Sequence, residues 1–169
     1  MENIKKLQRH AIIKILAFFV LSSISALACA SAQELVEPLA IITHQDTNVD
    51  ELTQDEVARI FLAEQQFWPD NSRITLLIRA PVSPERTFGL RQIYQMSEKE
   101  FRKYWITKMF KAEVASAPKV MYSLSMAINL VTAIPGAITF VPFSQVPVNA
   151  KVLKVNGKFP DDKDYEYRL

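Results

Sequence analysis

Residues 74–85 have the sequence Ile74-Thr75-Leu76-Leu77-Ile78-Arg79-Ala80-Pro81-Val82-Ser83-Pro84-Glu85, in which an apolar run leads into a helix start. The apolar run 74–78 is short and rich in branched side chains, and it predicts a buried β-strand. Ser83 suits the N-cap of a helix and Pro84 its first position, while the carboxylate of Glu85 would face the positive end of the helix dipole. The segment therefore predicts a strand, a turn and a helix in immediate succession.

Strands and helices alternate on both sides of this segment. Apolar runs predict further strands over 39–42, 137–141 and 151–155. Capping boxes and helical spacing predict helices that begin near 53, 83 and 97, and a further helix over 124–133. The early strands are continuously apolar, as strands covered on both faces must be. We expect an α/β fold: a three-layer sandwich with a mixed sheet and helices on both faces.

Two aromatic segments have less obvious positions. In the helix after residue 97, Phe101, Tyr104, Trp105 and Met109 form a stripe that we expect to lie in the core. The C-terminal segment 159–169 mixes charged and aromatic residues. We expect this tail at the surface, partly docked.

The N-terminal residues have the pattern of a secretory signal peptide. Four basic residues precede an apolar run of thirteen residues, 15–27, which is too short for the ~20 residues of a membrane-spanning helix. Ala30-Ser31-Ala32 is a signal peptidase site, so we predict a signal peptide over 1–32 and a single domain over 33–169 in the periplasm. In an alternative, a lipoprotein is anchored at Cys29, the only cysteine.

Composition limits the classes of function. Removal of residues 1–32 takes away four of the 20 Lys and Arg residues and one of the 18 acids, so the remaining chain is nearly neutral. We therefore expect neither nucleic acid nor a membrane as partner. His44 is the only histidine beyond the signal peptide, and no G-x-S-x-G motif is present, so we predict no metal site, no cofactor and no enzyme. We expect His44 in a solvated loop.

The strand-to-helix junction 79–83 is the best candidate for a binding site. In α/β sheets, ligands bind beyond the carboxyl ends of strands, and a helix N-terminus offers free N–H groups to an anion. Arg79 would add a positive charge and a planar set of donors. In the alternative, Ser83 serves only as a helix cap and Arg79 is solvated.

Several segments resemble one lobe of the phosphate-binding proteins of ABC phosphate transporters. The similar segments are Leu52-Thr53 to Leu62, Phe67-Trp68-Pro69-Asp70 leading to Arg79, Tyr104-Trp105 to Phe110, Pro118-Lys119-Val120 and Pro135-Gly136-Ala137-Ile138. The resemblance covers roughly residues 38–155. It implies a single lobe of a periplasmic binding protein-like fold, and phosphate or a related small oxyanion as ligand.

The resemblance also implies which residues bind. In the family, an Arg is followed four residues later by Ser-Gly-Thr at a helix start, and Arg79 and Ser83 match this spacing. Pro84 and Glu85 stand where the family has Gly and Thr, and Thr43 or His44 could complete the site. The implied partner is an ABC transporter permease. The alternative is an accessory domain that has lost its ligand and binds another envelope protein.

Overall fold

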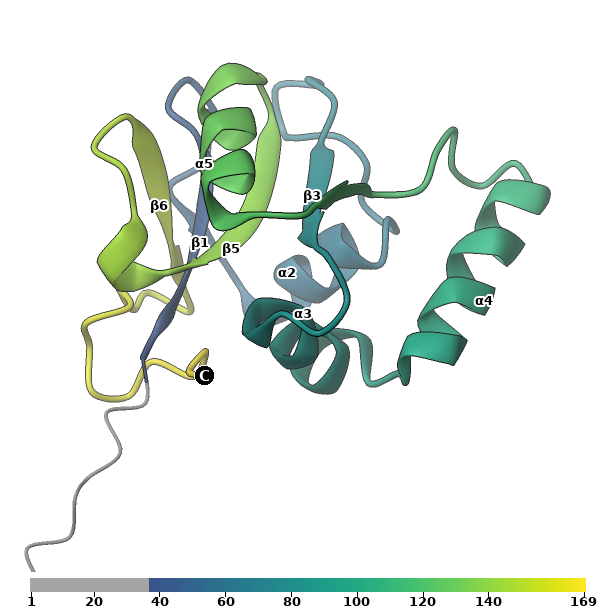
Figure 1. Ribbon diagram of the computed structural model, residues 1–169. Coiled ribbons are helices and arrows are strands. Elements are labelled where there is room, and N and C mark those ends of the chain that lie inside the picture. The colour runs from purple at the N-terminus through teal and green to yellow at the C-terminus, as the bar shows by residue number, and fades with distance from the viewer. Residues whose placement is uncertain (1–36) are drawn as a thin grey trace, which may run out of the picture. The chain divides into compact units, whose positions relative to one another are not determined.

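The computed structural model describes residues 37–169, and its centre is a mixed sheet of six strands (Figure 1). Their order across the sheet is β2-β6-β1-β5-β3-β4. The strands span Leu39–His44 (β1), Glu51–Leu52 (β2), Thr75–Arg79 (β3), Lys119–Met121 (β4), Ala137–Pro142 (β5) and Ala150–Val155 (β6). Strand β1 is antiparallel to both β5 and β6, whereas β3 is parallel to β4 and β5. The predicted mixed sheet is confirmed.

Helices cover both faces of this sheet, as predicted. They span Gln54–Phe61 (α2), Pro84–Gly89 (α3), Glu98–Phe110 (α4) and Leu124–Ala133 (α5), with a π-helical turn over Leu90–Tyr94 (η1) and a 3-10 turn over Phe143–Gln145 (η2). Helix α5 packs on β1, β3 and β5 in front of the sheet (Figure 1), while Phe61 of α2 and Phe88 of α3 belong to the hydrophobic core on the opposite face. The α/β three-layer architecture is therefore confirmed.

The two faces of the sheet have separate hydrophobic cores. Successive side chains of a strand point to opposite faces, so Leu39 and Ile41 of β1 pack with α2 while Ala40 and Ile42 pack with α5. All four side chains are fully buried. On the α2 face, the rings of Phe61 and Phe140 stack with their centroids 4.4 Å apart. Burial on both faces explains why this strand has no polar alternation.

Side-chain caps begin the helices at the predicted residues. The hydroxyl oxygens of Thr53 and Ser97 accept hydrogen bonds from the N–H groups of Glu56 and Glu100, whose carboxylates accept in return from the cap N–H groups. Both capping boxes are thus confirmed. The expected burial of the α4 stripe is confirmed for Phe101 and Trp105, each 4% exposed, but it is wrong for Met109, which is 40% exposed.

The C-terminal tail is docked through two tyrosines. Tyr165 and Tyr167 are each 3% exposed and belong to the core on the α2 face. The hydroxyl of Tyr165 donates to the carbonyl of Leu39 over 2.9 Å, and the N–H of Leu39 donates to the carbonyl of Tyr167 over 2.8 Å. Residues 161–164 and Glu166 are exposed, so the tail lies at the surface and is partly docked through its two tyrosines, as expected.

Two short strands were missed from the sequence, and the N-terminal prediction is not tested by the structure. Strands β2 and β4 were not predicted, because two or three residues are too few to show a periodicity. The proposed signal peptide over 1–32, including Cys29, lies outside the described residues and stays a prediction. Among residues 37–169, no helix has the length and apolar character needed to span a membrane.

Candidate functional site

The candidate site lies at the edge of the sheet where the parallel strands β3 and β4 both end. Arg79 and Met121 are partners in the register of these strands. A four-residue connection leads from β3 to α3, and a two-residue connection leads from β4 to α5. Two helices therefore begin at the carboxyl ends of neighbouring parallel strands, which is the usual position of ligand sites in α/β sheets.

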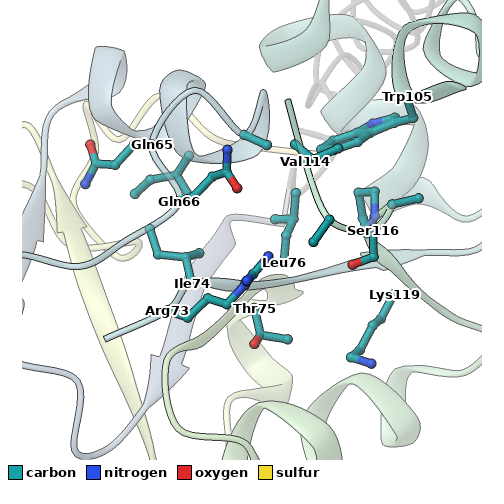
Figure 2. A pocket seen from close by; sticks show the side chains of 15 residues that line it. Gln65, Gln66, Arg73, Ile74, Thr75, Leu76, Trp105, Val114, Ser116 and Lys119 are labelled. Carbon is teal, nitrogen blue, oxygen red and sulfur yellow. The ribbon is translucent and has the colours of Figure 1, made fainter. Parts of the chain in front are cut away.

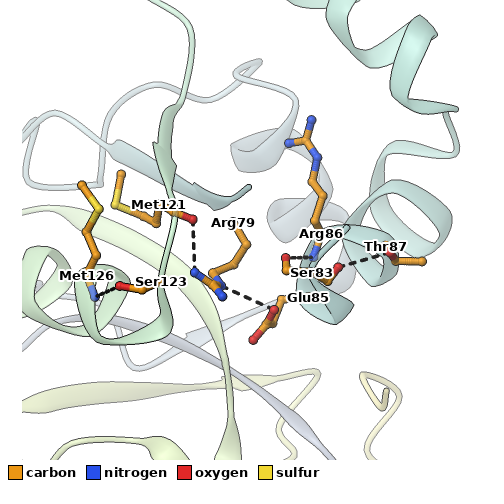
Figure 3. A network of polar contacts seen from close by, with 8 residues as sticks. All are labelled: Arg79, Ser83, Glu85, Arg86, Thr87, Met121, Ser123 and Met126. Atoms are coloured by element: carbon orange, nitrogen blue, oxygen red, sulfur yellow. Dashed lines mark hydrogen bonds and ion pairs between the residues drawn. The ribbon is translucent and has the colours of Figure 1, made fainter. Parts of the chain in front are cut away.

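Arg79 lies between the two connections (Figure 3). Its Nη1 donates to the carbonyl oxygen of Met121 over 3.1 Å, and its Nε lies 3.4 Å from Oε2 of Glu85. The side chain is 13% exposed. A guanidinium has five N–H donors, so three remain for another acceptor after these two contacts. Arg79 is therefore not the fully solvated side chain of the alternative interpretation.

The start of α3 combines a helix cap with an unusual backbone conformation. The hydroxyl oxygen of Ser83 accepts a hydrogen bond from the N–H of Arg86 over 3.2 Å, so Ser83 is the N-cap, as predicted. Pro84 occupies the first helical position and offers no N–H group. The preceding Val82 has φ +71° and is 97% exposed. A β-branched residue in this conformation is strained, and such strain concentrates at functional sites.

Glu85 brings a negative charge into the same site. Its side chain is 7% exposed and contacts Arg79. A buried carboxylate needs a positive partner, and here Arg79 supplies it. An incoming anion would meet a guanidinium whose charge is already balanced on one side, so Glu85 competes with an anion for Arg79.

Thr43 and His44 lie at the opposite end of the sheet. Thr43 and Leu76 are both level with Ile138 in the strand registers. Arg79 lies three residues beyond Leu76, about 10 Å along the strand, and β5 separates β1 from β3. A single small oxyanion cannot reach both ends. The structure therefore does not bring Thr43 or His44 to the site that they were expected to complete.

The polar groups of Thr43 and His44 already have partners within the fold. The hydroxyl of Thr43 donates to the carbonyl of Ala137 over 2.7 Å and lies 2.9 Å from the hydroxyl of Thr47. Nδ1 of His44 accepts from the N–H of Asp46 over 3.2 Å. His44 ends β1 and is 8% exposed, so the expectation of a solvated loop position was wrong.

Sequence reasoning missed the contribution of β4 and α5 to the site. The carbonyl of Met121 accepts from Arg79, and Ser123, the N-cap of α5, accepts from the N–H of Met126 over 3.1 Å. Ser125 Oγ lies 3.1 Å from Ser123 Oγ. The signal was present, because a serine before the apolar helix 124–133 is a typical N-cap, but without β4 nothing placed it beside Arg79.

A hollow of about 290 Å³ lies apart from the Arg79 site, near the amino ends of β3 and β4 (Figure 2). Arg73 and Lys119 lie below it in this view, and Trp105 and Val114 lie above. No sequence pattern indicated this hollow. It adjoins the amino ends of the parallel strands, where ligands of α/β sheets do not usually bind.

Residues 37–169 contain no group of three or more His, Cys, Asp or Glu side chains that could hold a metal ion.

The fold is similar to that of several solved phosphate-binding proteins. A putative phosphate ABC transporter substrate-binding protein with bound phosphate from Clostridium perfringens matches with TM-score 0.64 and 19% identity, over 78% of this chain and 52% of that one. An ABC-type phosphate transport receptor from Vibrio cholerae matches with TM-score 0.63 and 18% identity, over 78% of this chain and 54% of that one. A phosphate binding protein from Stenotrophomonas maltophilia matches with TM-score 0.55 and 18% identity, over 75% and 41%.

These similarities concern the fold. No family model and no curated protein matches the chain. The chain spans about half the length of the first two structures it matches. The described residues therefore share the fold of about half of each of these two proteins.

Proposed function

We propose that the domain binds phosphate or a related small oxyanion at Arg79 and the first turn of α3, and that it serves an ABC transporter. In this proposal the donors of Arg79 that are not used within the fold bind the oxyanion. The hydroxyl of Ser83 keeps its cap bond as an acceptor and donates to the ligand.

The observation that carries the proposal is the position of Arg79. It is a partly exposed guanidinium with donors to spare, at the carboxyl end of a parallel strand and beside a helix start. The fold adds support, because the C. perfringens protein with the same architecture was solved with bound phosphate. The alternative, an accessory domain that has lost its ligand, does not explain why Arg79 keeps donors that are not used within the fold.

Glu85 sets the expected strength of binding. Its carboxylate lies against Arg79, so a bound oxyanion would lie close to a second negative charge. We infer that the wild-type protein binds weakly, and that Glu85→Gln, which keeps the size and removes the charge, binds more tightly.

A thermal melting series with phosphate, sulfate and arsenate tests the proposal. Anion at about 100 times its dissociation constant stabilises a protein by ~2.7 kcal/mol, which raises the Tm of a domain of this size by roughly 5 to 10 degrees. We expect Glu85→Gln to reach this shift at a lower anion concentration than the wild type. The double variant Arg79→Ala/Glu85→Gln, which leaves no unpaired charge, should show no shift. The absence of a shift in both the wild type and Glu85→Gln would reject the proposal and favour the accessory domain.

The proposed function also includes a location. The sequence pattern of residues 1–32 supports export to the periplasm, where a transporter permease would be the partner. The mass of the exported protein distinguishes cleavage before Gln33 from lipid attachment at Cys29.

A further inference from the structure

A small cavity lies in a gap between two strands of the sheet. Strands β3 and β5 pair through Thr75 with Ala137 and through Leu76 with Ile138. Both strands continue beyond these pairs, and their later residues line a cavity of about 20 Å³. Helix α3 packs on both strands, and its Arg86 and Gly89 line the same cavity, as does Tyr94 of η1.

Two of the residues that line this cavity carry a buried polar atom without a hydrogen-bond partner on the α2 face of the sheet. Within residues 37–169, four buried side-chain N or O atoms have no hydrogen-bond partner: Arg86 Nη1, Tyr94 Oη, Thr139 Oγ1 and Trp105 Nε1. The first two belong to residues that line the cavity from the α2 face, whereas Thr139 is paired with Ile42 and points to the α5 face. Arg86 and Tyr94 are 6% and 5% exposed. Buried polar atoms are costly to leave unpaired, so two of them beside one cavity indicate an occupant.

Arg86 and Tyr94 are held in place by contacts that leave these atoms unused. Nε and Nη2 of Arg86 donate to the carboxylate of Glu98 over 3.1 and 2.9 Å, and its guanidinium lies 3.8 Å from the centre of the Phe101 ring. The ring of Tyr94 packs edge-on against the same Phe101 ring at 4.7 Å. Burial raises the pKa of the Tyr94 phenol, which therefore stays neutral. Neither side chain can turn to solvent for a partner.

The size and charge of the cavity define its occupant. A volume of 20 Å³ accommodates one water molecule, whereas the five heavy atoms of a phosphate do not fit. Arg79 and Arg86 both line the cavity and are paired with Glu85 and Glu98, respectively. The net charge around the cavity is therefore close to zero, and no ion is needed to balance it. The occupant must accept a hydrogen bond from Arg86 and can donate to or accept from the hydroxyl of Tyr94, as water can.

We propose that one ordered water molecule is bound in this cavity, where it accepts a hydrogen bond from Arg86 Nη1 and bonds to the hydroxyl of Tyr94. Two polar partners are enough to hold a buried water. The water connects α3 to η1 beside the point where β3 and β5 no longer pair. It is thus a structural component of the layer that positions the start of α3.

The direction in which Tyr94→Phe changes the Tm tests this proposal. Tyr94→Phe removes a hydroxyl with little change of shape. If the water is present, the variant loses a hydrogen bond and its Tm falls by roughly 3 to 5 degrees. If the cavity is dry, the variant removes an unsatisfied polar group, and its Tm stays unchanged or rises, which would overturn the proposal. Tyr165→Phe is the matched control, because the Tyr165 hydroxyl donates directly to the carbonyl of Leu39, and its Tm should fall in either case.

A crystal structure of the protein gives the direct test. We expect a density peak within about 3.2 Å of both Arg86 Nη1 and Tyr94 Oη. A crystal soaked in bromide should show no anomalous signal at this peak. An empty cavity, or bromide at the site, would contradict a bound water.

Discussion

The two ends of the central strands differ in how they use polar side chains. At the end where β1 stops, Thr43 is fully buried and its hydroxyl is bonded to Ala137 and Thr47. At the end where β3 stops, Arg79 retains donors beyond its contacts with Met121 and Glu85. The hydroxyl of Thr43 is fully hydrogen-bonded within the fold, while the remaining donors of Arg79 can still bind a ligand. Polar residues beside strand ends are therefore candidates for binding only where their hydrogen bonds are incomplete.

The largest effect on stability is expected from removal of the positive charge at the β3 end. Arg79→Ala leaves the carboxylate of Glu85 buried without its partner. Loss of one member of a buried ion pair costs about 3 kcal/mol or more, and we expect about 3 kcal/mol because Arg79 is partly exposed. Urea denaturation of the variant and the wild type measures this difference.

The double variant Arg79→Ala/Glu85→Gln identifies the origin of that loss. It removes both charges, so it should recover a large part of the stability that Arg79→Ala loses. If the double variant is as unstable as the single one, the loss comes from the contact with Met121 and from packing, and the ion pair is not responsible.

A smaller effect, of different kind, is expected at the β1 end. Thr43→Val keeps the shape but removes the hydroxyl, which leaves the carbonyl of Ala137 without that bond, and should cost about 1 to 2 kcal/mol. Thr43→Ser retains the hydroxyl and serves as the matched control. Neither variant should alter a phosphate-induced rise in Tm. A folded Thr43→Val protein that loses the rise would show that the two ends of the sheet act together.

Much of the fold could be predicted from local patterns. Ser83-Pro84, Thr53 with Glu56, and Ser97 with Glu100 each fix a helix start through contacts within a few residues. The apolar runs likewise indicated strands buried on both faces. Such features depend on neighbours in the sequence, so the sequence alone reveals them.

The composition of the site depends on contacts that no local pattern records. Thr43 and Arg79 both follow apolar runs in the sequence, but β1 runs antiparallel to β5 while β3 runs parallel to it, so their ends point in opposite directions. The pairing of Arg79 with Glu85 also needed the structure, because the sequence suggested only a nearby carboxylate. The burial of Tyr165 and Tyr167 likewise depends on β1, more than 120 residues earlier in the chain.

The smallest effect on stability is expected from removal of a helix cap. The cap of α3 lies at the candidate site, whereas the cap of α4 lies away from it. Ser83→Ala and Ser97→Ala should each cost about 1 kcal/mol at pH 7, and only Ser83→Ala should also weaken an anion-induced shift. The two caps differ at the third helical residue, which is Arg86 in α3 and Glu100 in α4.

Acid pH should therefore affect the two cap variants differently. Hydrogen bonds from the hydroxyl and the N–H of Ser97 lower the pKa of Glu100 in the folded protein. A carboxyl whose folded pKa is lowered stabilises the fold above its unfolded pKa, and this contribution disappears as the pH falls through the folded pKa. The stability difference between wild type and Ser97→Ala should thus shrink from pH 7 to about pH 3, whereas the difference for Ser83→Ala should stay nearly constant, because no carboxylate accepts from the cap of α3 at its third helical residue. Urea denaturation at the two pH values measures both differences, and an equal decrease for both variants would show that the Glu100 carboxylate does not distinguish the caps.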